Sequence, residues 1–315
     1  MAMPSSEHST IIGVDVAKAE LVIYEDSSGQ LSTIANNKTA IKQWIKALHG
    51  KVSIAIEATN VYHLLFTDMV HEAGHTLYLM DGYALSHYRK GIGSRAKTDP
   101  IDARVLARYL KNEGANLTPW IPPSTLYRDL VSLFRRRAML VQTRTALRLS
   151  WEGEPLLKSL LKSQLTSMKR LEDLIENMIK KLLDQAGLMP LVKQCMKVEG
   201  IGFLTAARLV ATYQRGEFKS ADAFIAFLGM DLRVAQSGKK KERSTLTKRG
   251  DPEVRRLLHN AAMSAGRTAA WKTFYEDKQS RGFKKTQVLV MLARKLARVV
   301  FALIRSGEEY RPKAT

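Results

Sequence analysis

The chain has 315 residues, 45% of them hydrophobic, which is typical of a globular protein large enough for more than one domain. Its one cysteine, Cys195, excludes an internal disulfide and a cysteine-based metal cage, and fits a reducing compartment. No apolar run is long enough to cross a membrane, and Met1 to Thr10 lacks the pattern of a secretory signal.

The excess of positive charge is confined to the later part of the chain. Residues 1–120 hold 12 Lys and Arg and 12 Asp and Glu, whereas residues 121–315 hold 38 and 18. The whole excess of +20 therefore lies after residue 120. Such asymmetry indicates a polyanionic partner, most often a nucleic acid, with a general role in solubility as the alternative.

The first 120 residues predict a mixed β/α domain. Short runs rich in Ile, Leu and Val predict strands, and apolar residues at helical spacing predict helices. A polar, basic, glycine-containing stretch at 84–94 predicts a loop. The expected elements are a β-hairpin at 10–26, strands at 31–35, 52–56 and 76–80, and helices at 38–48, 61–73 and 99–112.

Four acids in this domain occupy strand ends or a helix start. Asp15 lies near the end of the first apolar strand and Glu57 follows another, whereas Asp99 and Asp102 open a helix. Residues three apart on a helix share a face. The alternative is helix capping, with Asp99 as N-cap, Pro100 as the first helical residue and Asp102 as the acid of a capping box.

Convergence of these acids would require bound cations. Four carboxylates at one point repel one another strongly unless divalent ions neutralise them. Oxygen ligands with no His or Cys nearby suit Mg²⁺, with Mn²⁺ as a substitute. Two such ions about 4 Å apart can activate a nucleophile and stabilise the leaving oxygen of a phosphodiester. The set of acids therefore predicts metal-assisted phosphodiester chemistry.

A helical arm is expected after a proline-rich linker at Pro119, Pro122 and Pro123. Two long apolar stripes, at 126–150 and 156–185, indicate a helical hairpin or coiled coil that serves as a structural arm or dimer contact. The arginines at 135–137 either contact phosphates or form a solvated face.

The last part of the chain, 188–315, is expected to be mainly helical. Gly200 and Gly202 lie in a turn that resembles a helix-hairpin-helix, where glycines let backbone N–H groups approach a phosphate. A plain connection between helices is the alternative. Helices are expected at 204–211, 221–228, 252–269 and 286–304, with a polar, basic stretch at 272–285.

One serine of this part is followed by a dense run of cations. A serine hydroxyl that attacks phosphate needs nearby positive charge or a metal, because the transition state is anionic. On local grounds alone, Ser237 is better explained as an ordinary loop serine. The candidate nucleic-acid contacts around it are Lys239, Lys240, Lys241, Arg243, Lys248 and Arg249, in addition to Gly200 and Gly202.

The order of motifs along the whole chain resembles a known family. GVDVAK, AIEAT and KTDPIDA in the first part, followed by VEGIG, FIAFLG, AQSG and STLTKRGDPEVRRLL, resemble the DEDD transposases of bacterial insertion sequences. That family includes the pilin-gene invertases and the bridge-RNA-guided recombinases. The resemblance runs from about Ile11 to Gly307.

The resemblance implies an α/β plus all-α protein with three parts. These are a RuvC-like, ribonuclease-H-like catalytic domain at 1–120, a coiled-coil arm at 121–187 and a helical transposase domain at 188–315. The family's nucleophilic serine carries over onto Ser237. Ser244 is a competitor, because the segment after Ser237 is richer in lysine and poorer in serine than the family pattern. The catalytic acids, which hold Mg²⁺, carry over onto Asp15, Glu57, Asp99 and Asp102.

The resemblance also implies a mechanism and partners. Ser237 attacks a DNA phosphodiester and becomes covalently linked to it, in an active site shared between subunits of a dimer or tetramer. A structured guide RNA selects the donor and target DNA, and the protein works in the bacterial cytoplasm at the nucleoid.

Three other interpretations remain open at this point. The first is a junction resolvase or nuclease that shares the acids but uses no serine, and the second is a nucleic-acid binder without catalysis. The third, a sugar kinase or actin-like ATPase, needs a second glycine-rich phosphate loop, which AIEAT does not supply.

Overall fold

The computed structural model describes residues 10–58, 61–93, 98–233 and 245–311, together with the backbone of two short strands at 236–237 and 240–241. The chain divides into two compact units, Met1–Pro122 and Pro123–Thr315. In the described part of the chain, no helix combines the length and the apolar character that are needed to span a bilayer.

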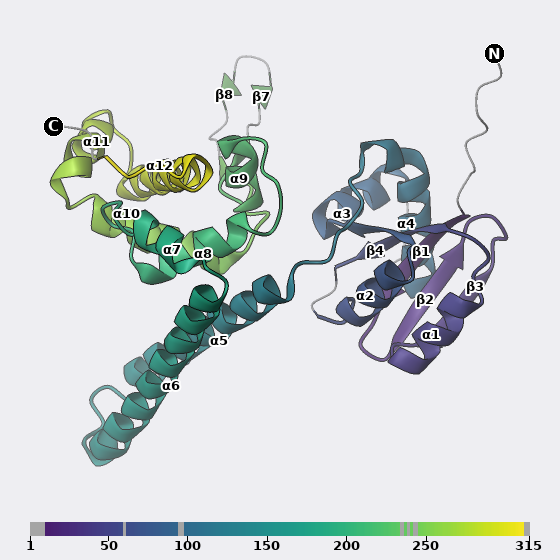
Figure 1. The fold of residues 1–315 in the computed structure, drawn as a ribbon, viewed down its shortest axis with the longest axis horizontal. Coiled ribbons are helices and arrows are strands. Elements are labelled where there is room, and N and C mark those ends of the chain that lie inside the picture. The colour runs from purple at the N-terminus through teal and green to yellow at the C-terminus, as the bar shows by residue number, and fades with distance from the viewer. Residues whose placement is uncertain are drawn as a thin grey trace. The chain divides into compact units, whose positions relative to one another are not determined.

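The first unit is built on a five-stranded mixed sheet (Figure 1). Its strands are β1 (Thr10–Val16), β2 (Glu20–Glu25), β3 (Leu31–Ala35), β4 (Val52–Glu57) and β5 (Thr76–Met80). Its helices are α1 (Lys38–Lys46), α2 (Leu64–Glu72), α3 (Gly82–Gly91) and α4 (Asp99–Glu113), followed by a 3-10 turn, Gly114–Asn116. The strand order is β3-β2-β1-β4-β5. The β1–β2 and β2–β3 pairs are antiparallel, and the β1–β4 and β4–β5 pairs are parallel, which is compatible with a ribonuclease-H-like domain.

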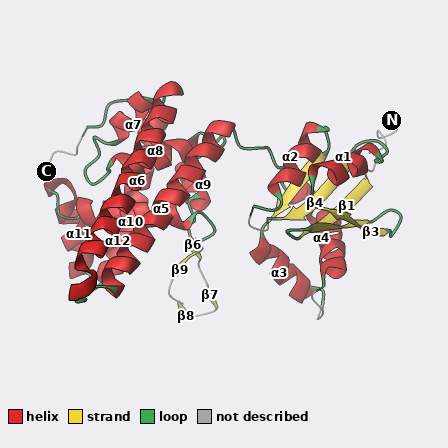
Figure 2. Ribbon diagram, turned by 90° about the horizontal axis from the view of Figure 1, so that it is seen from below, coloured by secondary structure: helices red, strands yellow, loops and turns green. Residues whose placement is uncertain are grey.

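Helices cover both faces of this sheet, α1 and α2 on one and α3 and α4 on the other (Figure 2). The alternation of side chains along a strand decides which residues meet which helices. On β1, Ile12, Val14 and Val16 belong to the core that α1 and α2 cover. Gly13 and Asp15 therefore face the layer formed by α3 and α4.

Two predictions for this unit are wrong. The expected loop at 84–94 is largely the helix α3, because the Asp81 side chain caps it by accepting a hydrogen bond from the N–H of Ala84 (2.9 Å) and because Leu85 is buried. The N-cap of α4 is Thr98 and not Asp99, so both acids of KTDPIDA lie inside the helix.

The second unit is helical. A long hairpin consists of α5 (Thr125–Ser150), a 3-10 turn (Pro155–Leu157) and α6 (Lys158–Gln185). The remaining helices are α7 (Met189–Cys195), α8 (Phe203–Tyr213), α9 (Ala221–Phe227), α10 (Pro252–Ala265), α11 (Ala269–Ser280) and α12 (Lys285–Ser306). The chain between α9 and α10 holds four two-residue strands, β6 (Leu232–Arg233), β7 (Gln236–Ser237), β8 (Lys240–Lys241) and β9 (Thr245–Leu246).

The boundaries in this unit differ from the expected ones at three places. The helix predicted for 252–269 ends at Ala265, and the polar stretch at 272–285 is mostly the helix α11. A further short helix, α7, follows the arm. Buried anchors explain two of these differences, because Trp271 and Val192 are 8% and 0% exposed and hold otherwise polar segments against the core.

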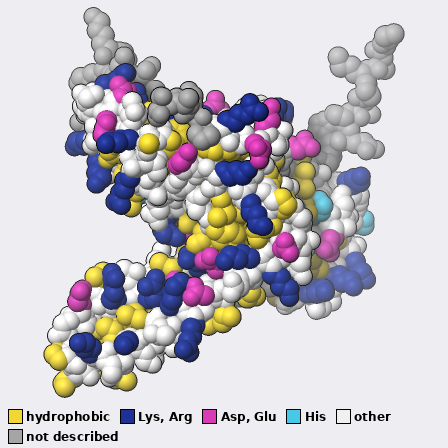
Figure 3. Space-filling model, turned by 60° about the vertical axis from the view of Figure 1, so that its left-hand side comes forward, with side chains coloured by type: hydrophobic (Ala, Val, Ile, Leu, Met, Phe, Trp, Pro, Cys, Tyr) yellow, Lys and Arg dark blue, Asp and Glu magenta, His cyan; other side chains and the backbone are white. Residues whose placement is uncertain are grey.

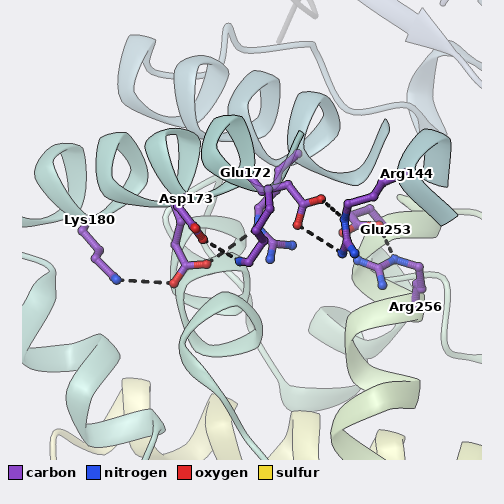
Figure 4. A network of polar contacts seen from close by, with 9 residues as sticks. Arg144, Glu172, Asp173, Lys180, Glu253 and Arg256 are labelled. Atoms are coloured by element: carbon purple, nitrogen blue, oxygen red, sulfur yellow. Dashed lines mark hydrogen bonds and ion pairs between the residues drawn. The ribbon is translucent and has the colours of Figure 1, made fainter. Parts of the chain in front are cut away.

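Ion pairs join the two helices of the arm (Figure 4). Arg144 of α5 lies 2.6 Å from Glu172 of α6, whose side chain is 2% exposed, and Arg137 lies 3.7 Å from Glu176. Buried apolar residues concentrate at the base of the arm, among them Leu130, Phe134, Ile179 and Leu183. Buried charge pairs of this kind favour one pairing register over others. The coiled-coil character of the arm stays a prediction.

Candidate active site

Two of the candidate acids end neighbouring parallel strands. The β1–β4 register pairs Val14 with Ile56, so the next residues along the two strands are Asp15 and Glu57. Both follow the pleat onto the face that α4 covers. The sequence prediction that these acids lie at strand ends is confirmed, and the register explains why they come close together.

The helix α4 brings the other two acids to the same strand ends. A Cβ atom added at Gly13 would lie 2.6 Å from the backbone nitrogen of Ala107 and closer still to the carbonyl oxygen of Ala103. Only glycine permits this approach of a helix backbone to β1. The first turn of α4 then carries Asp99, which is exposed, and Asp102, which is 5% exposed.

The four acids form one electrostatic cluster. Burial raises the pKa of Asp15 from 3.8 to about 6, and the negative charges of Asp99, Asp102 and Glu57 add to the rise. A hydrogen bond from the backbone of Val16 acts in the opposite direction. The charges of the other three acids therefore act on Asp15, and the strand register and the packing of α4 place all four near the carboxyl ends of β1 and β4.

The helix α3, which the sequence reasoning missed, contacts two members of the cluster. A Cβ atom at Gly82 would lie 2.5 Å from Oε1 of Glu57, so the glycine leaves room for that carboxylate. In the last turn of α3, Nη2 of Arg89 lies 2.7 Å from Oδ1 of Asp102. The capping signal of Asp81, followed by Leu85 and Tyr88 at helical spacing, would have predicted this helix and drawn attention to Arg89.

Helix capping does not account for Asp99 and Asp102. The N-cap residue is Thr98, with no side-chain capping hydrogen bond, and Asp102 lies beyond N3, the position that a capping box requires. The Asp102 carboxylate instead forms an ion pair with Arg89, with side chains 7% and 15% exposed respectively. The capping interpretation of this motif is therefore wrong.

The donors of the cluster suit a divalent cation, but the side chains do not surround one. Within residues 10–58, 61–93 and 98–122, no three His, Cys, Asp or Glu side chains are grouped closely enough to form a ready-made metal site. The mutual repulsion visible at Asp15 is the property that a bound cation would relieve. Carboxylate oxygens are the ligands that Mg²⁺ and Mn²⁺ prefer.

Ser237 lies in a small hairpin of the second unit. Its backbone pairs with that of Lys240, and Gln236 pairs with Lys241, in the β7–β8 ribbon. The predicted contacts Lys239 and Arg243, and the competitor Ser244, lie outside the described residues. The hairpin carries the serine and two of the predicted lysines on adjacent strands.

The stem of this hairpin is tied to the helical core. β6 pairs with β9, and the hydroxyl of Thr247 donates to the Asp231 carboxylate. A Cβ atom at Gly229, which has φ +66°, would lie 2.7 Å from the backbone nitrogen of Gly250. The next residues, Lys248 and Arg249, are exposed, and Lys248 has φ 58°, which is uncommon for a lysine.

A buried ion pair lies where the chain leaves the stem and enters α10. Arg208 of α8 is 2% exposed, and its Nη2 lies 2.8 Å from Oδ2 of Asp251, the N-cap of α10. The guanidinium carbon of Arg208 lies 5.9 and 5.5 Å from the ring centroids of Tyr127 and Phe134 on α5. Sequence reasoning did not find Arg208, whose partner lies 43 residues away.

The two glycines of the predicted phosphate turn have different surroundings. Gly200, with φ +86°, packs against α10, because an added Cβ would lie 2.5 Å from the carbonyl oxygen of Ala261. Gly202 is the N-cap of α8 and has open space beside it. Packing explains Gly200, so the predicted phosphate contact rests on Gly202.

Basic side chains are spread over the helical unit, including its arm (Figure 3). The three consecutive arginines of α5 divide by role. Arg137 pairs with Glu176 within the arm, and Arg135 lies 3.8 Å from Asp251. Arg136 is exposed. The predicted single solvated or phosphate-binding face therefore does not describe all three.

Comparison with known proteins gives two matches to family models. Residues 12–153 match the model for DEDD transposases of the IS110 type, described as a transposase, and residues 192–276 match the model described as transposase of the IS116/IS110/IS902 family. The first match contains all four clustered acids, and the second contains the hairpin with Ser237. The fold and these matches define the class of the protein, an enzyme of DNA recombination.

Relatives over nearly the full length agree with this class. A pilin gene-inverting protein from Moraxella bovis is 27% identical, with 96% of this chain and 97% of the relative covered. A probable family 20 transposase from Pseudomonas aeruginosa is 25% identical, with 82% and 86% covered. The chain belongs to the IS110-type family of DEDD transposases.

Proposed function

We propose that this transposase cuts and rejoins DNA through a covalent phosphoserine at Ser237, assisted by Mg²⁺ held by Asp15, Glu57, Asp99 and Asp102. The observation that carries the proposal is the effect of Glu57, Asp99 and Asp102 on the pKa of Asp15, which supports the convergence of the acids. It rests further on family membership, because the match over residues 192–276 includes the Ser-Gly pair.

The acids have two tasks in this proposal. When bound, the divalent cation supplies positive charge that stabilises the anionic transition state of phosphodiester cleavage. The carboxylates hold that cation and orient its charge. The pKa of Asp15, about 6 without metal, supports this role, because a bound cation would relieve the repulsion that adds to its rise.

In the serine step, one P–O bond forms for each P–O bond that breaks. The Ser237 Oγ–P bond forms while one P–O bond of the DNA backbone breaks, and the serine proton is transferred to a base. The broken backbone oxygen leaves as a hydroxyl. Attack by a hydroxyl from another DNA end reverses the step, joins the new strand and restores the free serine. No water is consumed, so the ends are exchanged and not hydrolysed.

The partners proposed are donor and target DNA together with a structured guide RNA. The net charge of +20 in residues 121–315 supports binding of polyanions. The proposed contacts are Gly202, Lys239, Lys240, Lys241, Arg243, Lys248 and Arg249. A discrete RNA that co-purifies with the protein, and that matches DNA beside the gene, is the expected result for RNA guidance.

We propose further that the arm joins subunits of a dimer or tetramer. Leu160, Leu174 and Met178 of α6 are 58%, 58% and 54% exposed and share one helical face. Exposed leucines in such a row favour a partner helix. Light scattering after chromatography is expected to give an oligomer for the native chain and a monomer for the Leu160→Lys, Leu174→Lys variant.

The serine assignment is tested by trapping protein–DNA adducts. The native chain and Ser244→Ala are expected to form an adduct whose linked nucleotide maps to the Ser237 peptide in mass spectrometry. Ser237→Ala is expected to form none while its DNA affinity stays within about twofold. Adducts that persist in Ser237→Ala, or hydrolysed DNA ends without any adduct, would contradict the proposal and favour a metal-dependent nuclease.

A further inference from the structure

A cation is built into the acid cluster. The guanidinium of Arg89 lies 2.7 Å from Oδ1 of Asp102, and the two side chains are 15% and 7% exposed. Pairs on open surface contribute little because water screens them, but this pair is largely shielded. Asp102 is also one of the acids whose charge raises the pKa of Asp15. One carboxylate therefore belongs both to the cluster and to an ion pair.

The position of α3 makes this pairing specific. Gly82, its first residue, leaves space for the Glu57 carboxylate, and Arg89, in its last turn, reaches Asp102. The neighbouring Lys90 is basic as well, but its side chain is exposed. The chain thus provides two adjacent cations, of which one is directed at the cluster.

A divalent cation needs the same carboxylate that Arg89 holds. An ion bound by Asp102 would share this carboxylate with the guanidinium, and like charges at such short range repel strongly even at an effective dielectric constant of about 20. Loss of an orienting partner weakens metal binding by about 10- to 100-fold. The repulsion between the unit charge of Arg89 and a divalent ion changes the metal affinity by a larger factor than this. Removing Arg89 is therefore expected to raise the metal affinity.

We propose that Arg89 competes with the divalent cation for Asp102 and thereby sets the metal affinity of the acid cluster. The inference rests on the proposed function in that it takes the four acids as the metal ligands. In the free protein Arg89 is the counter-ion of Asp102. Metal binding requires that this ion pair open, which lowers the affinity of the cluster for Mg²⁺ or Mn²⁺.

The test is a Mn²⁺ titration of the full-length protein without nucleic acid, followed by calorimetry or by the electron paramagnetic resonance signal of free Mn²⁺. Arg89→Gln is expected to bind Mn²⁺ at least about tenfold tighter than the native chain. Arg89→Lys keeps the charge and is expected to stay within about threefold. Lys90→Gln, the matched control, removes one charge next to Arg89 and is expected to bind as the native chain does.

A second readout separates metal affinity from folding. Mn²⁺ is expected to raise the Tm of Arg89→Gln by more than it raises the Tm of the native chain, because a bound ligand stabilises according to its affinity. Equal or weaker Mn²⁺ binding by Arg89→Gln would overturn the inference and leave Arg89 as a structural partner of Asp102. If neither protein binds Mn²⁺, the proposed metal site fails as well, so the two failures are distinguishable.

Should Arg89→Gln fail to fold, the double variant Arg89→Gln, Asp102→Asn removes both charges of the pair. It is expected to fold and to bind Mn²⁺ at least about tenfold tighter than Asp102→Asn alone, because the two proteins lack the same ligand but only the double variant lacks the repelling charge of Arg89. Equal binding by these two variants would show that Arg89 does not act on the metal site, and would overturn the inference.

Discussion

Burial and three other carboxylates together favour the protonated form of the Asp15 side chain. They raise its pKa to about 6, so a substantial part of the population carries a proton in mildly acid solution. Asp15 lies near the end of β1, next to the strand end that carries Glu57, on the face of the sheet that α4 covers. Its environment links the stability of the first unit to the chemistry proposed for it.

This linkage gives a pH dependence with a definite sign. In the unfolded chain Asp15 ionises at its ordinary 3.8, whereas the folded chain holds the proton to about 6. The free energy of unfolding therefore falls as pH rises from about 4 to about 6. Asp15→Asn removes this loss. Urea unfolding in EDTA is expected to show the variant about 1 kcal/mol more stable near pH 7.5, after allowance for solvent screening, and equal near pH 4.

A stability difference that is the same at both pH values would contradict this expectation, because it would mean that Asp15 ionises normally in the folded protein. Asp26, which is paired with Lys111 away from the cluster, provides the matched control. Asp26→Asn is expected to lack the gain in stability at the higher pH.

Single residues differed in how far the sequence could predict them. The four acids were predictable because a strand end or helix start is a local pattern around each. The pairings of Arg89 and Arg208 were not, because their partners, Asp102 and Asp251, lie elsewhere in the fold. A buried arginine has no sequence signature that distinguishes it from an exposed one.

Among the elements, the packing of α4 on β1 determines whether the acids meet. Gly13 allows the backbone of α4 to approach the strand, which places the first turn of the helix at the ends of β1 and β4. The contact involves backbone atoms of both elements, so neither can yield by changing a rotamer. The effect of a single methyl group at Gly13 is therefore large.

Gly13→Ala is expected to lower the free energy of unfolding by about 3 kcal/mol, because the new Cβ would overlap the backbone of Ala103 and Ala107. Gly91→Ala is the control, since its Cβ would meet nothing within 4 Å. It is expected to leave the stability unchanged or slightly raised. Equal denaturation midpoints for the native chain and Gly13→Ala would contradict the close approach.

The pair of Arg208 and Asp251 gives an asymmetric expectation in the second unit. Asp251→Asn keeps a side-chain cap for α10 but leaves the 2% exposed Arg208 without its carboxylate, which costs about 3 kcal/mol. Arg208→Met replaces the buried charge by an apolar chain and leaves Asp251 near Arg135, which costs less. Chemical unfolding of both variants measures the order, and a reversed order would contradict the burial of the cation.

The sequence predicted long helices and core strands better than short elements. The apolar stripes of α5, α6 and α12 repeat over many turns, so their existence was predictable. The two-residue strands β6 to β9 have too few residues for a period to show, and the polar, basic composition of α3 concealed its helical spacing. Tertiary partners, such as Leu85 in the core beside α4, stabilise α3.

For the whole molecule, the uneven distribution of charge indicates different roles for the two units, with the acid cluster in the first and polyanion binding in the second. The first unit has the acids and no net charge over residues 1–120, whereas the remainder carries +20. When the second unit binds a polyanion, the slope of log affinity against log salt concentration reports the number of phosphate contacts. That count can be obtained without knowledge of the target sequence.

Replacing Lys248 and Arg249 by Gln is expected to reduce the slope of log affinity against log salt by about 2, because each phosphate contact releases about one counterion. Lys42 and Lys46, exposed on α1 of the first unit, provide the matched control, and their replacement by Gln is expected to leave the slope unchanged. Binding of a random duplex, measured by fluorescence anisotropy across a salt series, distinguishes the two. An equal effect of both pairs would contradict a nucleic-acid surface on the second unit.

The central claim is that acids distant in the sequence act as one site in DNA recombination. It is tested most directly by recombination of a reporter plasmid that carries the DNA flanking the gene, with Asp15→Asn, Asp102→Asn, the double variant, and Glu72→Gln as an exposed control. Each single change is expected to reduce recombination by about 1,000-fold or more, the double variant no further, and Glu72→Gln not at all. Recombination near the native level in either single variant, or losses that multiply in the double variant, would contradict the account.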